Sequence, residues 1–274
     1  MPELPEVETV VRIIRPRLEG RVIHKARFAV PRQLAPQTPR GIAAAIRGVR
    51  INEVNRRGKY ILLDLSRGTL LIHLRMTGRL YVRTNNGVAL QYERAWLELD
   101  QGQELLAFRD PRTLGVIRFF KPNETIAPID ELGWEPLSET VEVAALKEVL
   151  SRRTIAIKPL LLDQSVWAGI GNIYASEALW EAQIDPRQSA ARLNRAQLQR
   201  LIEAVPSVLR RAVDRGGSTL KDFASPDGKP GNYQREFRVY DRVDEPCLRC
   251  GQPIIRIVQA QRSTYYCRNC QKRR

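Results

Sequence analysis

Four cysteines near the end of the chain have the spacing of a metal site. Cys247 and Cys250 are separated by two residues, sixteen residues follow, and Cys267 and Cys270 repeat the two-residue separation. Each such knuckle supplies two thiolates, and four thiolates complete a tetrahedral shell around Zn²⁺. Because a complete shell leaves no position for a substrate, the spacing predicts one structural zinc ion.

The first residues, Met1-Pro2-Glu3-Leu4-Pro5-Glu6, are a second candidate site. Loss of Met1 would expose Pro2 as a secondary amine, and an uncharged amine can attack an electrophilic carbon to form an imine-type intermediate. Glu3 and Glu6 place carboxylates beside it for proton transfer. On these residues alone, a proline that only eases removal of Met1 is the simpler interpretation, so the rest of the chain has to decide.

The composition predicts a polyanionic partner. The chain has 274 residues, of which 43% are hydrophobic, and a formal net charge of +15. Its length favours two domains, and its charge attracts nucleic acid first and an anionic membrane second. No apolar run has the length of a membrane span, and no secretory signal is present. We therefore expect a soluble protein with no membrane partner.

The hydrophobic pattern changes along the chain. Apolar residues at helical spacing predict a first helix up to about Arg15, which Pro16 ends or kinks. From about 22 to 120 the pattern is one of short strands, including a hairpin of 60–65 and 69–74, and predicts a β-sandwich or barrel. Helical periodicity returns after the Pro-rich crossing at 122–137, with helices near 143–150, from 172, and over 198–209.

Two glycine-rich segments could contact a ligand. Gly169-Ile170-Gly171-Asn172 precedes a helix, whose unpaired N–H groups could bind a phosphate, although a simple turn between helices explains it equally well. The segment 216–231 is rich in turn-forming residues and longer than a simple connection requires, which predicts a mobile binding loop.

Taken together, these motifs resemble the formamidopyrimidine-DNA glycosylase family over nearly the whole chain. The resemblance is carried by seven motifs in the family's order. They are residues 1–9, Arg57-Gly58-Lys59-Tyr60, Ile72-His73-Leu74 with Met76, Asp110-Pro111-Arg112, residues 169–177, Gly217-Ser218-Thr219-Leu220-Lys221-Asp222-Phe223, and the Cys₄ segment with Ala260-Gln261-Arg262.

The resemblance implies an α+β multidomain fold. An N-terminal catalytic β-sandwich with flanking helices would occupy residues 1–130, a helix–two-turn–helix DNA-binding domain residues 131–235, and a β-hairpin Cys₄ zinc finger residues 236–274. Damaged double-stranded DNA would lie in the cleft between the domains, and a monomer is sufficient for this arrangement. The expected location is the bacterial cytosol or nucleoid.

The resemblance also implies a reaction in base-excision repair. The enzyme would remove oxidised purines, such as 8-oxoguanine and formamidopyrimidines, and then cleave the strand by β,δ-elimination as a lyase. Pro2 would attack the sugar C1′ and form a Schiff base, and Glu3 would give and take protons. Lys59 would assist the lyase steps, and Arg262 is assigned to the same catalytic group.

Further residues match the family's contacts with DNA. Met76, Arg112 and Leu114 would fill the gap left by the flipped base, although the family commonly has Phe where this chain has Leu114. Loss of that aromatic ring removes a stacking contact of roughly 1–3 kcal/mol. Lys59, His73, Asn172 and Arg262 match the phosphate clamp, and Lys158 matches another DNA-binding position. The base pocket would be formed by Ile173, Ser218, Thr219 and Tyr240.

Two other functions fit part of the pattern. Endonuclease VIII shares the fold and the nucleophile but prefers oxidised pyrimidines, whereas Leu4 and the long Gly-Ser-Thr-Leu-Lys loop favour the purine enzyme. A non-catalytic zinc-ribbon DNA-binding protein would explain the charge and the cysteines but leaves Pro2, Glu3 and Lys59 unexplained. A hydrolytic nuclease is less consistent still, because the chain has two histidines, His24 and His73, and no carboxylate cluster beyond the N-terminal turn.

Overall fold

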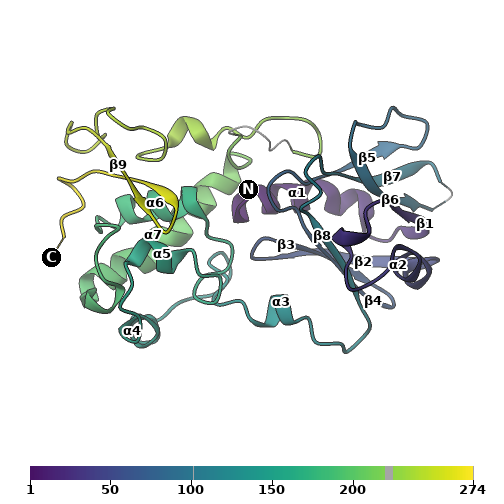
Figure 1. Cartoon of the computed structure of the whole chain (residues 1–274), viewed down its shortest axis with the longest axis horizontal. Helices are drawn as coiled ribbons and strands as arrows, with labels where there is room; N and C mark the ends of the chain where they lie inside the picture. The colour runs from purple at the N-terminus through teal and green to yellow at the C-terminus, as the bar shows by residue number, and fades with distance from the viewer. Residues whose placement is uncertain (101, 220–224, 274) are drawn as a thin grey trace. The chain divides into compact units, whose positions relative to one another are not determined.

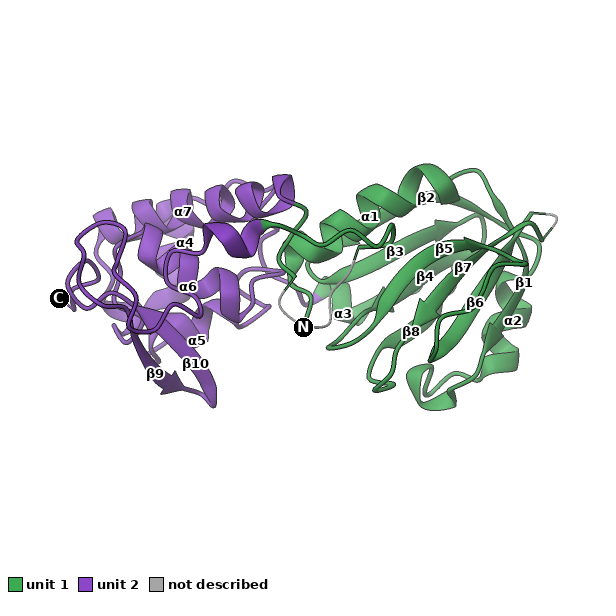
Figure 2. Ribbon diagram, turned by 90° about the horizontal axis from the view of Figure 1, so that it is seen from above, with its two compact units in different colours: residues 1–130, 216–232 green, residues 131–215, 233–274 purple. Residues whose placement is uncertain are grey.

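The computed structural model describes residues 1–100, 102–219 and 225–273. The chain divides into two compact units (Figure 2), the first formed by residues 1–130 and 216–232 and the second by residues 131–215 and 233–274. Unit 1 is therefore built from two separate stretches of sequence. The three domains expected from the sequence are a different division, and they stay a prediction.

An antiparallel sheet forms the core of unit 1, with the strand order β5-β7-β6-β1-β2-β3-β4-β8 (Figure 1). Its strands are β1 (Val22–Phe28), β2 (Val49–Arg57), β3 (Tyr60–Leu65), β4 (Gly68–His73), β5 (Arg79–Thr84), β6 (Glu93–Leu99), β7 (Glu104–Arg109) and β8 (Val116–Phe120). Side chains of β4 and β8 line the same small cavity as side chains of β6 and β7. The sheet thus folds over its own apolar face, which confirms the predicted sandwich.

Helix α1 (Leu4–Leu18) buries one apolar side against this sheet and contacts β2, β3 and β5. It runs three residues past the end indicated by the sequence, with Pro16 inside it. Pro16 is exposed whereas Leu18 is fully buried. Burial of a leucine contributes about 1.5–3 kcal/mol, comparable with the ~3 kcal/mol cost of an internal proline, so the last turn is retained.

Short helices complete the described part of unit 1. They are the 3₁₀ helix η1 (Pro31–Gln33), α2 (Pro39–Ile46) and α3 (Ala127–Asp130). Helix α2 lies in a stretch where the sequence pattern predicted strands only. Thr38 caps it by accepting a hydrogen bond from the Gly41 N–H at 3.1 Å, and Ile42 and Ile46 pack into the core.

Unit 2 combines helices with a two-stranded hairpin. Its elements are α4 (Val143–Ser151), α5 (Ile157–Leu161), α6 (Asn172–Glu181), η2 (Ala190–Arg192), α7 (Arg195–Asp214), η3 (Tyr233–Glu236), β9 (Ile255–Gln259) and β10 (Arg262–Tyr266). Helix α6 packs against α7 and β10, and every residue from 173 to 180 is buried. It is therefore the central helix of the unit, and the predicted helical half with a terminal hairpin is confirmed. No helix in the described part of the chain has the length and apolarity to cross a membrane.

Candidate active site and zinc centre

The first residues of the chain are buried and fixed at the start of α1. Glu3 is the N-cap residue, and its carboxylate accepts a hydrogen bond from the Glu6 N–H. In return, the Glu3 N–H donates to Oε2 of Glu6 at 2.8 Å. This reciprocal capping box satisfies two donors that a helix start would otherwise leave unpaired. Pro2 and Glu3 are both buried, so the start of the chain is held in a fixed position.

The same Glu6 carboxylate binds the returning segment of unit 1. Its Oε1 accepts hydrogen bonds from the backbone N–H of Ser218 at 2.7 Å and from the Ser218 hydroxyl at 3.0 Å. A Cβ at Gly217 would lie 2.9 Å from that oxygen, and Gly217 has a φ of +74°. The close approach therefore requires glycine.

Of the four predicted base-pocket residues, Ser218 and Thr219 lie in this segment. The Thr219 hydroxyl accepts a hydrogen bond from the Gly231 N–H at 2.9 Å, which holds the two ends of the loop together. Residues 220–224, including the Leu-Lys-Asp-Phe part of the motif, lie outside the described residues. Ser218 is thus placed beside the N-terminus of α1, and no spacing along the sequence could have shown this.

Lys59 occupies the tight turn between β2 and β3. Gly58 in this turn has a φ of +55°, in the left-handed region that favours glycine. Arg56 donates to the Gly58 carbonyl at 2.9 Å and to Oε2 of Glu8, on α1, at 2.8 Å. Burial alone would raise the pKa of Glu8, but hydrogen bonds from Arg56 and Arg12 lower it. Glu8 therefore remains a carboxylate and ties the Lys59 turn to α1, the helix that directly follows Pro2 and Glu3.

His73, at the end of β4, is a buried neutral imidazole. Burial is the main reason that its pKa falls to about 3, and the positive charges of Arg75 and Lys59 lower it further. Its Nδ1 accepts a hydrogen bond from the Arg75 N–H at 3.0 Å. The neutral ring must then carry its proton on Nε2, where it can donate to an anion. Tyr60, the residue after Lys59, pairs with His73 across β3 and β4, so two predicted phosphate-clamp residues lie near each other.

Met76, Arg112 and Leu114 stand exposed on two loops of unit 1. Met76 is 40% exposed and Leu114 is 42% exposed, although both are large apolar side chains. Exposed apolar residues on ordered loops are the kind of group that fills a gap between stacked bases. The predicted trio is therefore available to contact DNA.

A buried carboxylate, Asp110, connects these two loops. Its Oδ1 accepts from the hydroxyl of Thr77, next to Met76, at 2.5 Å. Its Oδ2 accepts from the Gly115 N–H, next to Leu114, at 2.7 Å and from Nε2 of Gln33 at 2.8 Å. Asp110 was part of a sequence motif but had no predicted role, because the spacing along the chain does not reveal its partners.

In unit 2, Lys158 and Asn172 hold the hairpin that carries Arg262. The buried Lys158 ammonium donates to Oδ1 of Asn172 at 2.6 Å and to Oγ1 of Thr264 at 2.8 Å. Lys158 and Nδ2 of Asn172 both donate to the Ser263 carbonyl, at 2.9 Å and 3.0 Å. Arg262 itself is exposed at the start of β10. Lys158 thus acts on the hairpin in this structure, which the sequence could not distinguish from a direct contact with DNA.

Two further residues position the predicted site but were missed from the sequence. Gln164 accepts a hydrogen bond from the Gly169 N–H and donates to the Ile170 carbonyl, both at 2.9 Å, which fixes the glycine loop before α6. Glu177, on α6, accepts from the backbone N–H groups of residues 238–240 at 2.8–3.0 Å. The one indication of this role in the sequence was that Glu177 is a charged residue in a mostly apolar stretch of α6.

The other two base-pocket residues belong to unit 2. Ile173 is buried in the first turn of α6. The Tyr240 N–H is one of the three that Glu177 binds, and the Tyr240 ring lies against those of Phe237 and Tyr265, with centroids 5.4 Å and 5.1 Å away. Both residues therefore have fixed positions within their own unit.

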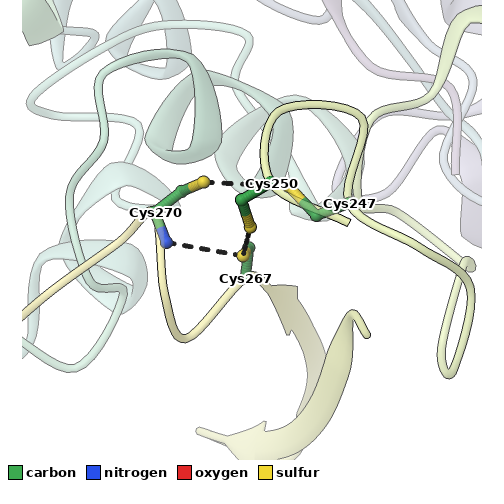
Figure 3. Close-up of side chains that lie close together, drawn as sticks. All are labelled: Cys247, Cys250, Cys267 and Cys270. Atoms are coloured by element: carbon green, nitrogen blue, oxygen red, sulfur yellow. Dashed lines mark hydrogen bonds between the residues drawn. The ribbon is translucent and has the colours of Figure 1, made fainter. Parts of the chain in front are cut away.

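The four cysteine sulfurs converge beside the hairpin (Figure 3). All four lie within 4.8 Å of one another, with Sγ–Sγ distances of 3.9 Å for Cys247–Cys270 and 3.5 Å for Cys250–Cys267. A zinc ion at 2.3 Å from four sulfurs requires sulfurs about 3.8 Å apart. A hydrogen bond from the Asn269 side chain is the main reason that the pKa of Cys250 falls to about 6, whereas burial raises the pKa of Cys267 and Cys270. The spacing of the four sulfurs is therefore the observation that indicates a metal. The site fits zinc.

Comparison with known proteins agrees with this geometry. Residues 1–117 match the family model described as the formamidopyrimidine-DNA glycosylase N-terminal domain, and residues 132–224 match its H2TH domain. Residues 244–273 match a zinc finger found in FPG and IleRS. The formamidopyrimidine-DNA glycosylase of Thiobacillus denitrificans is 42% identical over 99% of this chain and 100% of its own length. This chain belongs to the formamidopyrimidine-DNA glycosylase family. The family member from Chloroflexus aurantiacus is 44% identical over 99% of this chain and 98% of its own length.

Solved structures of the family share the fold. The MutM (Fpg) protein from Thermus thermophilus superposes with a TM-score of 0.88 at 39% identity, covering 98% of both chains. Lactococcus lactis Fpg in complex with abasic-site DNA superposes with a TM-score of 0.90 at 30% identity, covering 99% of this chain and 100% of the other. A second Lactococcus lactis complex, with DNA containing N7-benzyl-Fapy-dG, has a TM-score of 0.90 at 31% identity and covers the same shares. The resemblance proposed from the sequence is confirmed.

Proposed function

We propose that this chain excises oxidised purines from double-stranded DNA and cleaves the strand at the resulting abasic site, with Pro2 as nucleophile. The observation that carries the proposal is the fixed N-terminus, where the Glu3–Glu6 capping box and the Ser218 contacts hold Pro2 and Glu3. Family membership supports the reaction class, and the structures of relatives with damaged DNA support the substrate.

The first step uses the amine exposed when Met1 is removed. The partial positive charge at the start of α1 disfavours a protonated amine, which favours the nucleophilic form. The Pro2 nitrogen attacks C1′ of the damaged nucleotide, the C1′–base bond breaks, and the leaving base takes a proton from water. Glu3 accepts the proton that the Pro2 nitrogen loses and gives it to O4′ as the C1′–O4′ bond opens, which leaves an iminium between Pro2 and C1′. Glu3 thus works as both proton donor and proton acceptor.

Strand cleavage follows from the iminium. Removal of a C2′ proton expels the 3′ phosphate by β-elimination, and a second elimination expels the 5′ phosphate. Lys59 assists these proton transfers from the β2–β3 turn, which Arg56 and Glu8 tie to α1. The products are a gap with a phosphate at each side and the released sugar fragment.

Binding of the DNA backbone is assigned to four side chains. Lys59 and Arg262 supply positive charge, while Nε2 of His73 and the side-chain amide of Asn172 supply neutral donors. Met76, Arg112 and Leu114 fill the space left by the flipped base. The zinc finger holds one structural zinc ion per chain, and a monomer is the functional form.

A comparison of substrates tests this function. The chain, with its authentic N-terminus, is incubated with duplexes that carry 8-oxoguanine opposite cytosine or thymine glycol opposite adenine, and strand cleavage is followed by gel. Faster cleavage at 8-oxoguanine is expected. Preference for thymine glycol would indicate the endonuclease VIII type of specificity, and tight binding without cleavage of either duplex would overturn the proposed reaction.

A further inference from the structure

The last turn of α6 enters the apolar core of the zinc finger through one side chain, Trp180. Trp180 is only 4% exposed and packs in one cluster with Cys247, Cys267 and neighbouring apolar residues of the finger. The zinc knuckle therefore does not rest on its own hairpin alone. It is packed against the helix that begins at Asn172.

Trp180 also makes a polar contact with a zinc ligand. Its indole Nε1 donates a hydrogen bond to Sγ of Cys247 at 3.4 Å. The same sulfur receives the backbone N–H of Arg249. Thiolates bound to zinc retain negative charge, and N–H donors from the surroundings fix their orientation and stabilise that charge. The indole thus orients one ligand of the predicted metal.

Arg249, between the first two cysteines, holds the indole in place. Its guanidinium carbon lies 3.8 Å from the centroid of the Trp180 ring, which is a close cation–π contact. The same guanidinium donates to the carbonyls of Trp180 at 2.6 Å and Glu181 at 3.2 Å, the last residues of α6. A cation over the ring draws electron density toward it and makes the indole N–H a stronger donor. The same guanidinium lies 3.8 Å from Oε1 of Glu181, so an ion pair also holds it at the end of α6.

We infer that Trp180 and Arg249 are a positioning pair that retains the zinc ion and fastens the finger to α6. The opposite end of α6 begins with Asn172, which binds the Ser263 carbonyl next to Arg262. The two ends of one helix therefore hold the metal knuckle and the hairpin that carries a predicted phosphate contact. The proposal adds residues to the zinc site that the Cys₄ spacing does not contain.

The test compares zinc retention in matched variants of the full chain. Trp180→Phe keeps a ring in the core but removes the N–H, and Arg249→Lys keeps the charge but loses the planar stack. Trp167→Phe is the control, because Trp167 is also buried in unit 2 and has no hydrogen bond to a cysteine among the described residues. Zinc transfer to a chromogenic chelator is measured at equilibrium and as a rate, with thermal unfolding of the zinc-loaded proteins alongside.

Substitution of a residue that hydrogen-bonds to a metal ligand typically weakens metal binding by about 10- to 100-fold. We expect Trp180→Phe to lose zinc affinity by about tenfold or more, Arg249→Lys to lose less, and Trp167→Phe to match the wild type. Equal affinity in Trp180→Phe and the wild type would overturn the proposal. An equal loss in the Trp167→Phe control would also overturn it, because the effect would then be one of general packing.

Cobalt substitution gives a spectroscopic readout that packing alone would not change. Removing an N–H donor makes the thiolate richer in electrons, so its sulfur-to-cobalt charge-transfer band should move to lower energy in Trp180→Phe. The same band should stay in place in Trp167→Phe. An unchanged band in the Trp180→Phe protein would show that the indole does not donate to the metal-bound sulfur.

Discussion

The Glu6 carboxylate and the backbone N–H of Ser218, 212 positions apart in the sequence, are joined by a hydrogen bond of 2.7 Å. Through this contact one carboxylate fixes both the start of α1 and the segment that carries two predicted base-pocket residues. The other oxygen of the same carboxylate binds the Glu3 N–H.

Glu6→Gln should therefore impair catalysis without touching the nucleophile. The amide nitrogen cannot accept a hydrogen bond, so at least one buried donor loses its partner, at a cost of about 1–3 kcal/mol. If this free-energy cost raises the transition state relative to the free enzyme and DNA, kcat/KM for cleavage at 8-oxoguanine drops on the order of tenfold to hundredfold. Ser218→Ala keeps the backbone bond and removes only the hydroxyl bond, so it should lose less. Normal kcat/KM in Glu6→Gln would contradict the assigned role.

The buried neutral state of His73 predicts a specific pH dependence of stability. The unfolded chain binds a proton at His73 below its ordinary pKa of 6.5, whereas the folded chain binds it only near pH 3. Stability from this group is complete above pH 6.5 and is lost as the pH falls toward 3. The expected slope is about 1.4 kcal/mol per pH unit within that window.

Urea unfolding of the wild type and His73→Gln between pH 6.5 and 4 measures this effect. The wild type should lose stability more steeply on acidification than the variant. His24→Gln is the matched control, because His24 is exposed, and it should follow the wild type. Parallel curves for the wild type and His73→Gln would show that His73 is not held neutral by burial.

Salt titration separates the role of Lys158 from that of Arg262. Lys158→Met removes the buried ammonium that donates to Asn172, Ser263 and Thr264, which loosens the hairpin, so DNA affinity should fall while the slope of log Kd against log salt stays unchanged. Arg262→Gln removes an exposed charge, so that slope should decrease by about 1. A reduced slope in Lys158→Met would mean that Lys158 contacts a phosphate directly.

The cysteine cluster predicts that Cys250→Ser loses the metal. A serine hydroxyl is a poor zinc ligand at neutral pH, so three thiolates remain and the shell is open. Elemental analysis after dialysis should find one zinc per wild-type chain and much less than one in the variant, with weaker DNA binding. Full zinc occupancy in Cys250→Ser would contradict the four-thiolate site.

Local spacing predicted those parts of the site whose partners are close in sequence. The cysteine pairs, the β3–β4 hairpin and the helix starting at Asn172 depend on neighbours a few residues away, and the structure has them where the pattern indicates. The role of Asp110 depends on partners at Thr77 and Gln33, and the burial of Lys158 depends on the hairpin more than a hundred residues later. Tertiary packing determines such roles, and the hydrophobic periodicity of a single sequence does not reveal which distant residues pack together.

The type of a residue did not by itself determine its role. A lysine in a basic protein is most simply interpreted as a contact for DNA, yet Lys158 is buried among oxygen acceptors. The sequence pattern indicated a helix from Asn172, but Glu177 within it and Trp180 near its end have roles that only their contacts reveal. In both cases the structure shows which contacts hold the site in position.

Borohydride trapping on a duplex with 8-oxoguanine opposite cytosine shows whether the amine of Pro2 forms the covalent intermediate. Three proteins are compared: the chain with Met1 removed, the same chain with a short N-terminal extension, and Pro2→Gly. We expect a covalent adduct with the first, none with the second and strongly reduced trapping with the third. An extended protein that is trapped and turns over normally would contradict the assignment of Pro2, because Pro2 has no free amine in that protein.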